Sequence, residues 1–371
     1  VTTHPLSSAR ATGIDVEGGV NNMTITNSGS INVYAITANG GSANAYGIRV
    51  AATGPVSAAA GDVLTINNSG DIIARFSTDG GTTFHRATAI DVTEAPSPTV
   101  INLLGGNITG DINLQSDADA INVATGETFF NGVINAGCYD ATAIAAGGDN
   151  PTASSCGVGT LTIGDGADAG GNMHMTIDPV DGPSYAFVNT FTVNSDGTIT
   201  YDLPAATGGT ATPGTYPQIF ADTANLSGTL VANISSPNGL YDTTTYDNVI
   251  DANVRNGEFD QCLINGIPTG SLLLHFGCVY DNQNNVDLAL TRTPFDQVAG
   301  LNGNGVAVGT GLDSYFNVNL TGGAANMFAD LFLMTDAANY NVALNMLSGS
   351  VYANYLNSFP SLCVHYNDLV D

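Results

Sequence analysis

The chain has 371 residues, of which 43% are hydrophobic and only 11% are charged; six arginines and no lysine stand against 33 acidic residues. The formal net charge of −27 repels phosphate backbones and anionic lipid, so nucleic-acid binding is excluded. No apolar run reaches the roughly 18 residues that a membrane-spanning helix needs, so this segment is expected not to insert into a membrane.

A six-residue phrase recurs along the first third of the chain: a small residue, any residue, Gly or Ala, Ile, any residue, and Val or its equivalent. The phrase occupies residues 11–16, 45–50, 87–92 and 118–123. A second phrase, beginning Thr-Ile and ending Asn-Ser-Gly, occupies residues 24–29 and 65–70. Recurrence at intervals of this size indicates an architecture of stacked coils.

The repeated phrases alternate apolar and polar residues, as expected for strands with one buried face. Asn and Gly between them supply the corners, so three short strands make one coil of a parallel β-helix. A lipocalin-like barrel or a sandwich fits less well, because neither requires the same phrase at matching positions. We therefore predict an all-β parallel β-helix over residues 1–292, with Ile14, Ile48, Ile90 and Ile121 aligned in one core column.

The five cysteines predict two local disulfides, Cys138–Cys156 and Cys262–Cys278, with Cys363 either free or bridged to another chain. Zinc is the alternative, but no CxxC or His-rich spacing supports it. The two disulfides are expected to close loop excursions at 136–160 and 262–278. Together with a first residue other than Met, which suggests a removed leader or an internal start, they favour an oxidising compartment outside the cytosol.

The pattern changes after Arg292, and residues 293–371 are predicted to form a short helical C-terminal cap. Pro294 suits the first turn of a helix, and residues 324–336 and 340–357 are expected to be helical. An apolar stripe is expected on the second of these helices. Its members are Val342, Leu344, Leu347, Val351, Tyr355 and Leu356.

Several segments in this order resemble the passenger domain of a type V autotransporter. Residues 191–201, 226–230 and 286–295 are similar to the junction before the translocator, and residues 345–353 resemble the helix that leads into the membrane barrel, with Ser350 where the family often has Glu. The resemblance implies a right-handed β-helix, export through the outer membrane, and display on the cell surface or release. The translocator barrel is absent from these residues.

Catalytic chemistry has few candidates in this sequence. Neighbouring acids occur as pairs that are expected to stabilise turns, and a lyase base is not evident because Arg49, Arg75 and Arg86 share no acidic motif. The pairs are Asp117 and Asp119, Asp165 and Asp168, and Asp178 and Asp181. A serine protease is disfavoured by the absence of G-x-S-x-G, and His174 is expected to be an ordinary strand residue. We therefore expect no catalytic residue, cofactor or metal site; a calcium site at Asp165 lacks the repeated Gly-Asp pattern.

These observations favour a non-catalytic bacterial protein, on the cell surface or secreted, that acts in adhesion, self-association or extracellular assembly. The expected partners are other copies of the chain, or glycans and proteins of a host or neighbouring surface, contacted through the two excursions. Removing residues 139–155 is therefore expected to weaken adhesion. The alternatives are a carbohydrate-active β-helix enzyme, as a polysaccharide lyase or hydrolase, and a spacer for an N-terminal effector domain.

Overall fold

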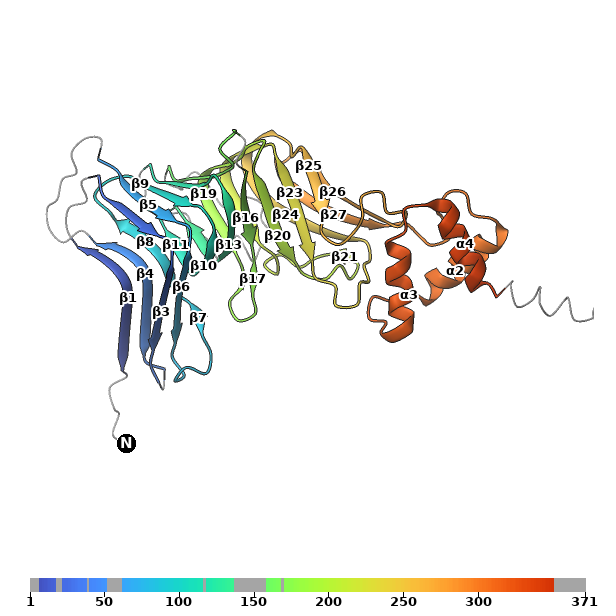
Figure 1. Ribbon diagram of the computed structural model, residues 1–371, viewed down its shortest axis with the longest axis horizontal. Coiled ribbons are helices and arrows are strands. Elements are labelled where there is room, and N and C mark those ends of the chain that lie inside the picture. The colour runs from blue at the N-terminus through green and yellow to red at the C-terminus, as the bar shows by residue number, and fades with distance from the viewer. Residues whose placement is uncertain are drawn as a thin grey trace, which may run out of the picture.

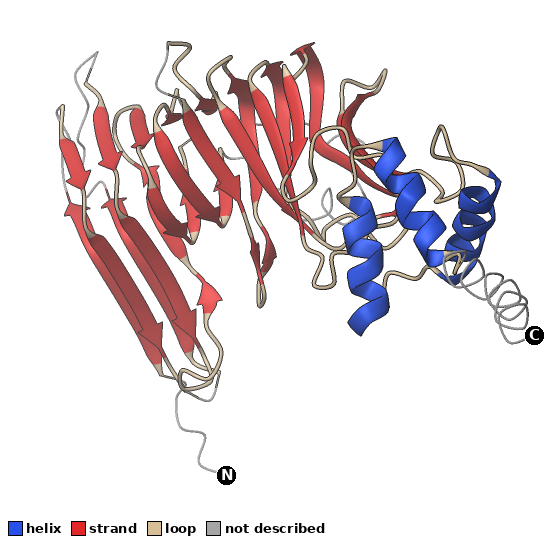
Figure 2. Cartoon of the chain, turned by 45° about the vertical axis from the view of Figure 1, so that its right-hand side comes forward, coloured by secondary structure: helices blue, strands red, loops and turns tan. Residues whose placement is uncertain are grey.

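The computed structural model describes residues 7–17, 22–38, 40–51, 62–115, 118–136, 158–167 and 170–349. In these ranges the chain forms an elongated stack of β-coils with helices at its C-terminal end (Figure 1). Figure 2 shows the strands of successive coils side by side along the stack. The predicted all-β parallel β-helix with a helical C-terminal cap is confirmed.

Each of the early coils contributes three strands. The first position holds β1 (Ser8–Glu17), β4 (Ser42–Ala51), β8 (Thr88–Glu94), β11 (Asp111–Asn113) and β14 (Val133–Asn135). The second position holds β2 (Thr24–Asn27), β5 (Leu64–Asn68), β9 (Thr99–Leu103), β12 (Ala120–Val123) and β15 (Thr160–Ile163). The third position forms sheet B, with β3 (Ser30–Ile36), β6 (Asp71–Ser77), β10 (Gly106–Thr109), β13 (Gly126–Asn131), β16 (Gly171–Met175), β20 (Thr198–Leu203), β23 (Thr229–Ile234) and β25 (Gln261–Ile264).

The first two strand positions merge in the later coils. The strand β19 (Tyr185–Val193) pairs with β14 through its first residues and with β15 through its last, so one long strand replaces two short ones. The strands β22 (Gln218–Leu226) and β24 (Thr244–Gly257) continue this arrangement. Both positions therefore belong to one sheet, sheet A, and the later coils have one corner fewer than the early ones.

The predicted core column is correct for Ile14, Ile48 and Ile90, which are direct register partners, and wrong for Ile121. The column continues through Ile112 on β11, whereas Ile121 lies on β12, in the second strand position of the coil, between Ile101 and Leu161. The reason is that strands at both positions carry the same alternation of aliphatic and polar residues, so the phrase at 118–123 looks like a continuation of the first column.

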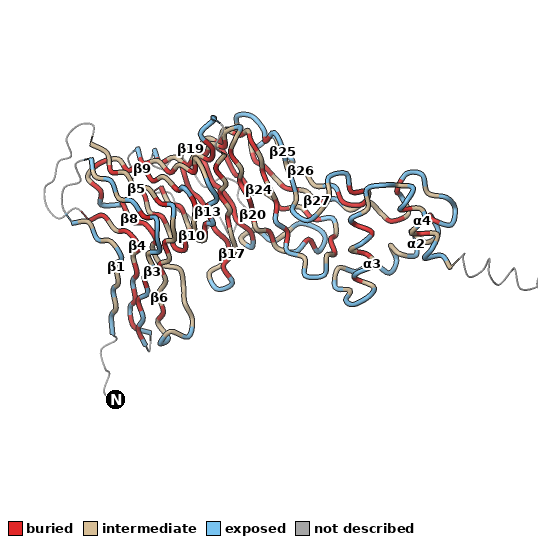
Figure 3. Tube along the Cα trace, viewed as in Figure 1, coloured by how far each residue is buried: buried red, intermediate tan, exposed pale blue. Residues whose placement is uncertain are grey.

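Side chains facing into the stack are buried, as the red stretches in Figure 3 show. One pair of polar side chains in the interior bonds between neighbouring coils: the Asn27 amide donates to Asn68 Oδ1 at 2.7 Å, and both side chains are buried. The second strand position also carries an outward column of Thr and Asn only. Its members are Thr26, Asn67, Asn102, Asn122, Thr162, Thr192, Asn225 and Asn256.

The last coil is closed by a hairpin of β26 (Leu274–Tyr280) and β27 (Val286–Arg292), which run antiparallel to each other while β27 pairs antiparallel with β24. The stretch 262–278, expected to be a loop excursion, is a loop only in its middle, at residues 265–273, and its two ends belong to the strands β25 and β26. Its alternating residues pack into the end of the core rather than leaving it. Four two-residue strands complete the sheets: β7 (His85–Arg86), β17 (Ile177–Asp178), β18 (Gly182–Pro183) and β21 (Gly209–Thr210).

The cap contains α2 (Gly303–Tyr315), α3 (Gly322–Phe332) and α4 (Ala337–Leu347). The helix α2 contains several glycines, and packing requires one of them: at the buried Gly309, a Cβ would lie 2.6 Å from the backbone of Asp296. Residues 293–300 are turns rather than the start of a helix. Among the described residues, no helix combines the length and the apolar character needed to cross a bilayer.

The apolar stripe predicted for the last helix is correct only in part. Leu344 is buried, whereas Val342 and Leu347 are 56% and 45% exposed. The helix packs instead through Tyr340 and Leu344, because Tyr340 reaches the carbonyl of Phe295 with its hydroxyl at 2.9 Å. Residues 351, 355 and 356 of the predicted stripe lie outside the described part of the chain.

Candidate binding groove on sheet B

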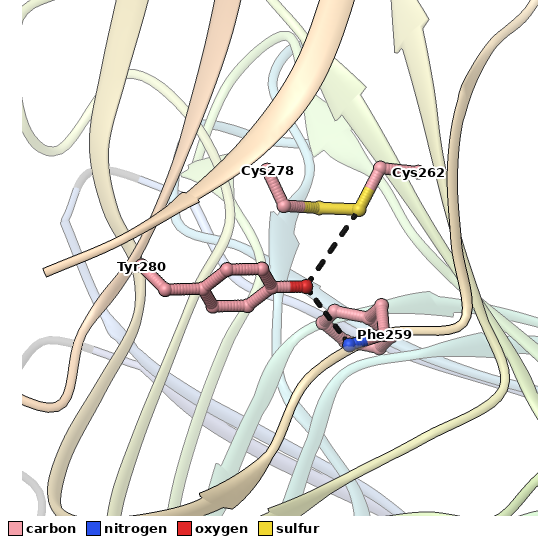
Figure 4. Close-up of a disulfide and its surroundings, with 4 residues drawn as sticks. All are labelled: Phe259, Cys262, Cys278 and Tyr280. Carbon is pink, nitrogen blue, oxygen red and sulfur yellow. Dashed lines mark hydrogen bonds between the residues drawn. A yellow bond between two sulfur atoms is a disulfide. The ribbon is translucent and has the colours of Figure 1, made fainter.

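The predicted cysteine pair Cys262 and Cys278 forms a disulfide that joins β25, the last strand of sheet B, to β26 of the closing hairpin. The Tyr280 hydroxyl lies beside this bridge, 3.9 Å from the Cys262 sulfur, and accepts a hydrogen bond from the Phe259 amide at 2.8 Å (Figure 4). The bridge therefore fastens the end of the stack. The predicted pair Cys138 and Cys156, the segment 139–155 and Cys363 lie outside the described residues.

The acids singled out from the sequence are engaged in the fold. Asp119 is buried and accepts hydrogen bonds from the amides of Thr99 and Gln115, both at 2.7 Å, and Asp165 accepts one from the Ala167 amide at 2.8 Å. Their predicted role in stabilising turns and corners agrees with these bonds. Their sequence neighbours Asp117 and Asp168 lie outside the described residues.

The arginines that share no acidic motif in the sequence nevertheless have acidic partners in space. Arg75 pairs with Asp178 at 3.0 Å, and the Arg86 side chain and backbone both contact Asp181. His85 lies 2.8 Å from the other oxygen of Asp181. These contacts connect the hairpin of β6 and β7 to the hairpin of β17 and β18. This charged cluster therefore stabilises the packing of one coil against another.

A groove of about 580 Å³ with a mainly apolar lining lies at the ends of the strands β20 and β23 of sheet B. Its lining comes from three segments: Ile177 on β17, the four residues that begin with Asp202 at the end of β20, and Asn233 and Ser235 at the end of β23. The complete lining is Ile177, Asp202, Leu203, Pro204, Ala205, Asn233 and Ser235.

Three neighbouring strands of sheet B hold the groove carboxylate in place. His174 on β16 presents Nε2 at 2.8 Å from Asp202 Oδ1, and the Asn233 amide donates to the same oxygen at 2.7 Å. Because an ionised carboxylate can only accept, His174 carries a proton on Nε2. The second oxygen, Oδ2, makes no hydrogen bond with the described part of the chain. It is therefore available to a ligand in the groove.

The same contacts set the charge of Asp202. Partial burial alone raises the pKa of its carboxyl, but the hydrogen bonds from His174 and Asn233 and the attraction of His174 outweigh that effect. The pKa of Asp202 is therefore lower than its ordinary value, and the groove carries a fixed negative charge at neutral pH.

An exposed aromatic side chain extends this surface along sheet B. Phe129 on β13 is 37% exposed, and its ring centroid lies 4.9 Å from that of His174. Beside it, Asn172 donates to Glu127 at 3.2 Å and accepts from the Thr200 hydroxyl at 3.1 Å. The outer face of sheet B therefore joins aromatic, amide, hydroxyl and carboxylate groups on one rigid support.

The sequence identified His174 as a strand residue, which is correct, but it did not identify Asp202, Asn233 or Phe129. Asp202 lies in an ordinary alternating stretch, and its partners are 28 and 31 residues away. No local motif marks such a site, because the register between coils brings its members together.

A second recess, of about 220 Å³, lies on the first strand position between β4 and β11. Asp111 lines it together with Arg86 and Tyr46, and Asp111 Oδ1 accepts a hydrogen bond from the Val133 amide at 2.9 Å. Burial raises the pKa of this carboxyl, and the repulsion of Asp181 adds to that effect, against the attraction of Arg86. Within the described ranges, no three His, Cys, Asp or Glu side chains are grouped to hold a metal ion.

Comparison of the chain with protein-family models, with curated proteins and with solved structures gives no match.

Proposed function

We propose that this chain is a non-catalytic extracellular β-helix that acts in bacterial adhesion and binds a glycan of a neighbouring surface through the sheet B groove. The observation that carries the proposal is the free Oδ2 of Asp202 in a largely apolar groove, where two hydrogen bonds to its other oxygen hold the carboxylate in place. Sugars present hydroxyl donors around an apolar ring face, and that is the chemistry such a recess accepts.

The rigidity of the site supports binding at a surface. Asp202, His174 and Asn233 all lie on strands whose inward neighbours are buried, so little ordering is needed when a ligand arrives. Display or secretion through the outer membrane is part of the proposal. It is supported by the Cys262–Cys278 disulfide, since such bonds persist in oxidising compartments.

Retention on immobilised glycans tests this proposal. The purified chain is passed over neutral, amine-bearing and acidic polysaccharides, and the variant Asp202→Asn with Asn233→Ala is run beside it. We expect retention on at least one polymer by the parent chain, strongly reduced retention of the variant, and no release of reducing ends. A parent chain that passes every polymer freely contradicts the proposal.

Self-association is a second role that a specific feature favours. The outward Thr and Asn column runs through eight coils, and within it the Asn102 amide donates to Asn67 at 2.8 Å while Asn122 donates to Asn102 at 3.1 Å. A regular, uncharged column of this kind can pair with the same column of another copy. Analytical ultracentrifugation over a range of concentrations tests it, and a monomer throughout would exclude this role.

The carbohydrate-active alternative rests on Asp111, whose raised pKa and position in a recess beside Arg86 are typical of a general acid. Hydrolysis also needs a second carboxylate, and the nearby Asp181 is occupied by His85 and Arg86. If the chain is such an enzyme, the parent chain cleaves a polysaccharide and Asp111→Asn abolishes the cleavage.

A further inference from the structure

The hydrogen-bonding groups of the sheet B groove are mostly acceptors. Asp202 Oδ2 and Asn233 Oδ1 make no hydrogen bond with any described residue, and Asn233 is exposed. The Ser235 hydroxyl, also exposed and equally free among the described residues, lies beyond them at the end of β23. A ligand that satisfies this set must contribute donors at the Asp202 end.

Charge restricts the ligand further. Asp202 is ionised, and the nearest basic side chain, His174, points at Oδ1 rather than into the groove. The chain as a whole carries a formal net charge of −27. An acidic sugar would therefore meet repulsion both from the groove and from the surrounding field, whereas an ammonium group would gain a charge-assisted hydrogen bond.

Apolar residues of the lining suit a sugar ring. Ile177 and Pro204 are partly exposed and Ala205 is exposed, so a pyranose can lay its C–H face on them while its substituents reach Asp202 and Asn233. The exposed ring of Phe129, which contacts the His174 ring at a tilt of 39°, lies along the same sheet and offers a second platform to a longer chain. The site therefore fits a polymer rather than a single sugar.

We propose that the groove binds an amine-bearing polysaccharide, with the ammonium group of a 2-amino sugar paired to Asp202 Oδ2 and a neighbouring hydroxyl donating to Asn233. This inference names the ligand class for the function proposed above and rests on it. Binding is non-covalent, and no bond of the sugar changes.

Isothermal titration of the intact chain with glucosamine oligosaccharides tests the inference at mildly acidic pH, where the amine is protonated and Asp202 remains ionised. Fully N-acetylated oligosaccharides of the same length are the matched ligand control. We expect the glucosamine oligomer to bind, the acetylated oligomer to bind about tenfold more weakly or worse, and Asp202→Asn to weaken glucosamine binding by about tenfold or more.

Glu17→Gln is the matched protein control, because it removes one negative charge from an exposed position at the end of β1, outside the groove and outside sheet B. We expect it to change the affinity less than twofold. Far-UV circular dichroism and thermal unfolding verify that both variants are folded. If a variant does not fold, Asn233→Ala, which changes an exposed side chain, takes its place and is expected to weaken binding.

Three results would overturn the inference. Equal losses of affinity in Asp202→Asn and Glu17→Gln would show attraction by the general field of the chain, and equal binding of the acetylated oligomer would show that the ammonium is not recognised. No binding of the glucosamine oligomer would also exclude it. In each case, retention of the chain on another polysaccharide would leave the proposed adhesion function intact. A failure of the proposed ligand class can therefore be distinguished from a failure of the proposed function.

Discussion

Arg75 and Asp178 lie 103 positions apart in the chain, yet the guanidinium of Arg75 donates to the carboxylate of Asp178 at 3.0 Å. The Asp178 side chain is only 1% exposed, and Asn131, from a coil between them, donates to the same oxygen at 3.2 Å. Asp178 directly follows Ile177, which lines the sheet B groove. The pair therefore fixes the hairpin that forms one side of the proposed binding site.

Replacing Arg75 with Gln is expected to lower the free energy of unfolding by about 1–3 kcal/mol, because the buried Asp178 carboxylate loses its charged partner. Urea unfolding measures the change. Arg10→Gln is the control, since Arg10 is 52% exposed and its pair with Asp15 spans 3.6 Å; exposed pairs contribute at most about 1 kcal/mol. Equal effects of the two substitutions would contradict a structural role for the Arg75 pair.

Asp111→Asn is expected to stabilise the chain at neutral pH. The pKa of Asp111 is raised in the folded state, chiefly by burial. Ionisation therefore costs folding free energy, and the cost appears as the pH rises from the ordinary carboxyl pKa, about 4, through the higher folded pKa. Across this range, the free energy of unfolding of the variant should rise relative to that of the parent as the pH rises. A difference in unfolding free energy that does not depend on pH would contradict the raised pKa of Asp111.

Asp178→Asn should have the opposite pH dependence. Burial alone raises the pKa of Asp178, but the amides of Val180 and Asp181 and the pairing with Arg75 bring it below the ordinary value. The stabilisation is present above about pH 4 and is lost as the pH falls through the lower folded pKa. The variant should be less stable than the parent at neutral pH, with the difference shrinking in acid. A difference that grows in acid would exclude this explanation.

Removing the disulfide by the double substitution of Cys262 and Cys278 with Ser is expected to cost about 3 kcal/mol, the typical value for a closed loop of about 15 residues. The loss should concentrate at the closing hairpin, so limited proteolysis is expected to cut between β25 and β26 first. Adding a reductant to the parent should reproduce the effect. First cleavage within the early coils would contradict the fastening role assigned to this bridge.

Core columns differ sharply from the outer faces in their tolerance of substitution. Ile90→Ala removes a fully buried side chain from the first column and should cost about 2–5 kcal/mol. Ile36→Ala, on the outer face of β3 where the side chain is 47% exposed, should cost less than about 1 kcal/mol. The denaturant midpoints of the two variants measure these losses of stability. Similar losses in both variants would mean that the inward and outward faces of one strand are misassigned.

The early coils could be predicted from the sequence because the same alternation recurs at Ile14, Ile48 and Ile90, and stacking places equivalent residues in register. Ile121 was misassigned because the first and second strand positions share that alternation. The loop predicted over 262–278 is correct only for residues 265–273, because the two flanking cysteines lie on the strands β25 and β26 and not at the base of a loop. Local pattern predicts that a strand forms and does not predict which neighbour it chooses.

The candidate site could not be predicted in the same way. Asp202 needs His174 from the preceding coil and Asn233 from the following one, and their alignment depends on the lengths of the turns between strands. A shift of one residue in β20 would turn Asp202 into the core and Tyr201 outward. The buried ring of Tyr201 fixes the register, so the packing of the core determines which groups meet on the surface.

Hydrogen–deuterium exchange of the intact chain, with and without a retained polysaccharide, tests the central claim most directly. The account predicts added protection at residues 202–205 and 233–235, none at the outward Asn column of the second strand position, and no protection in Asp202→Asn. Protection confined to the Asn column or the helical cap, with residues 202–205 unchanged, would contradict it.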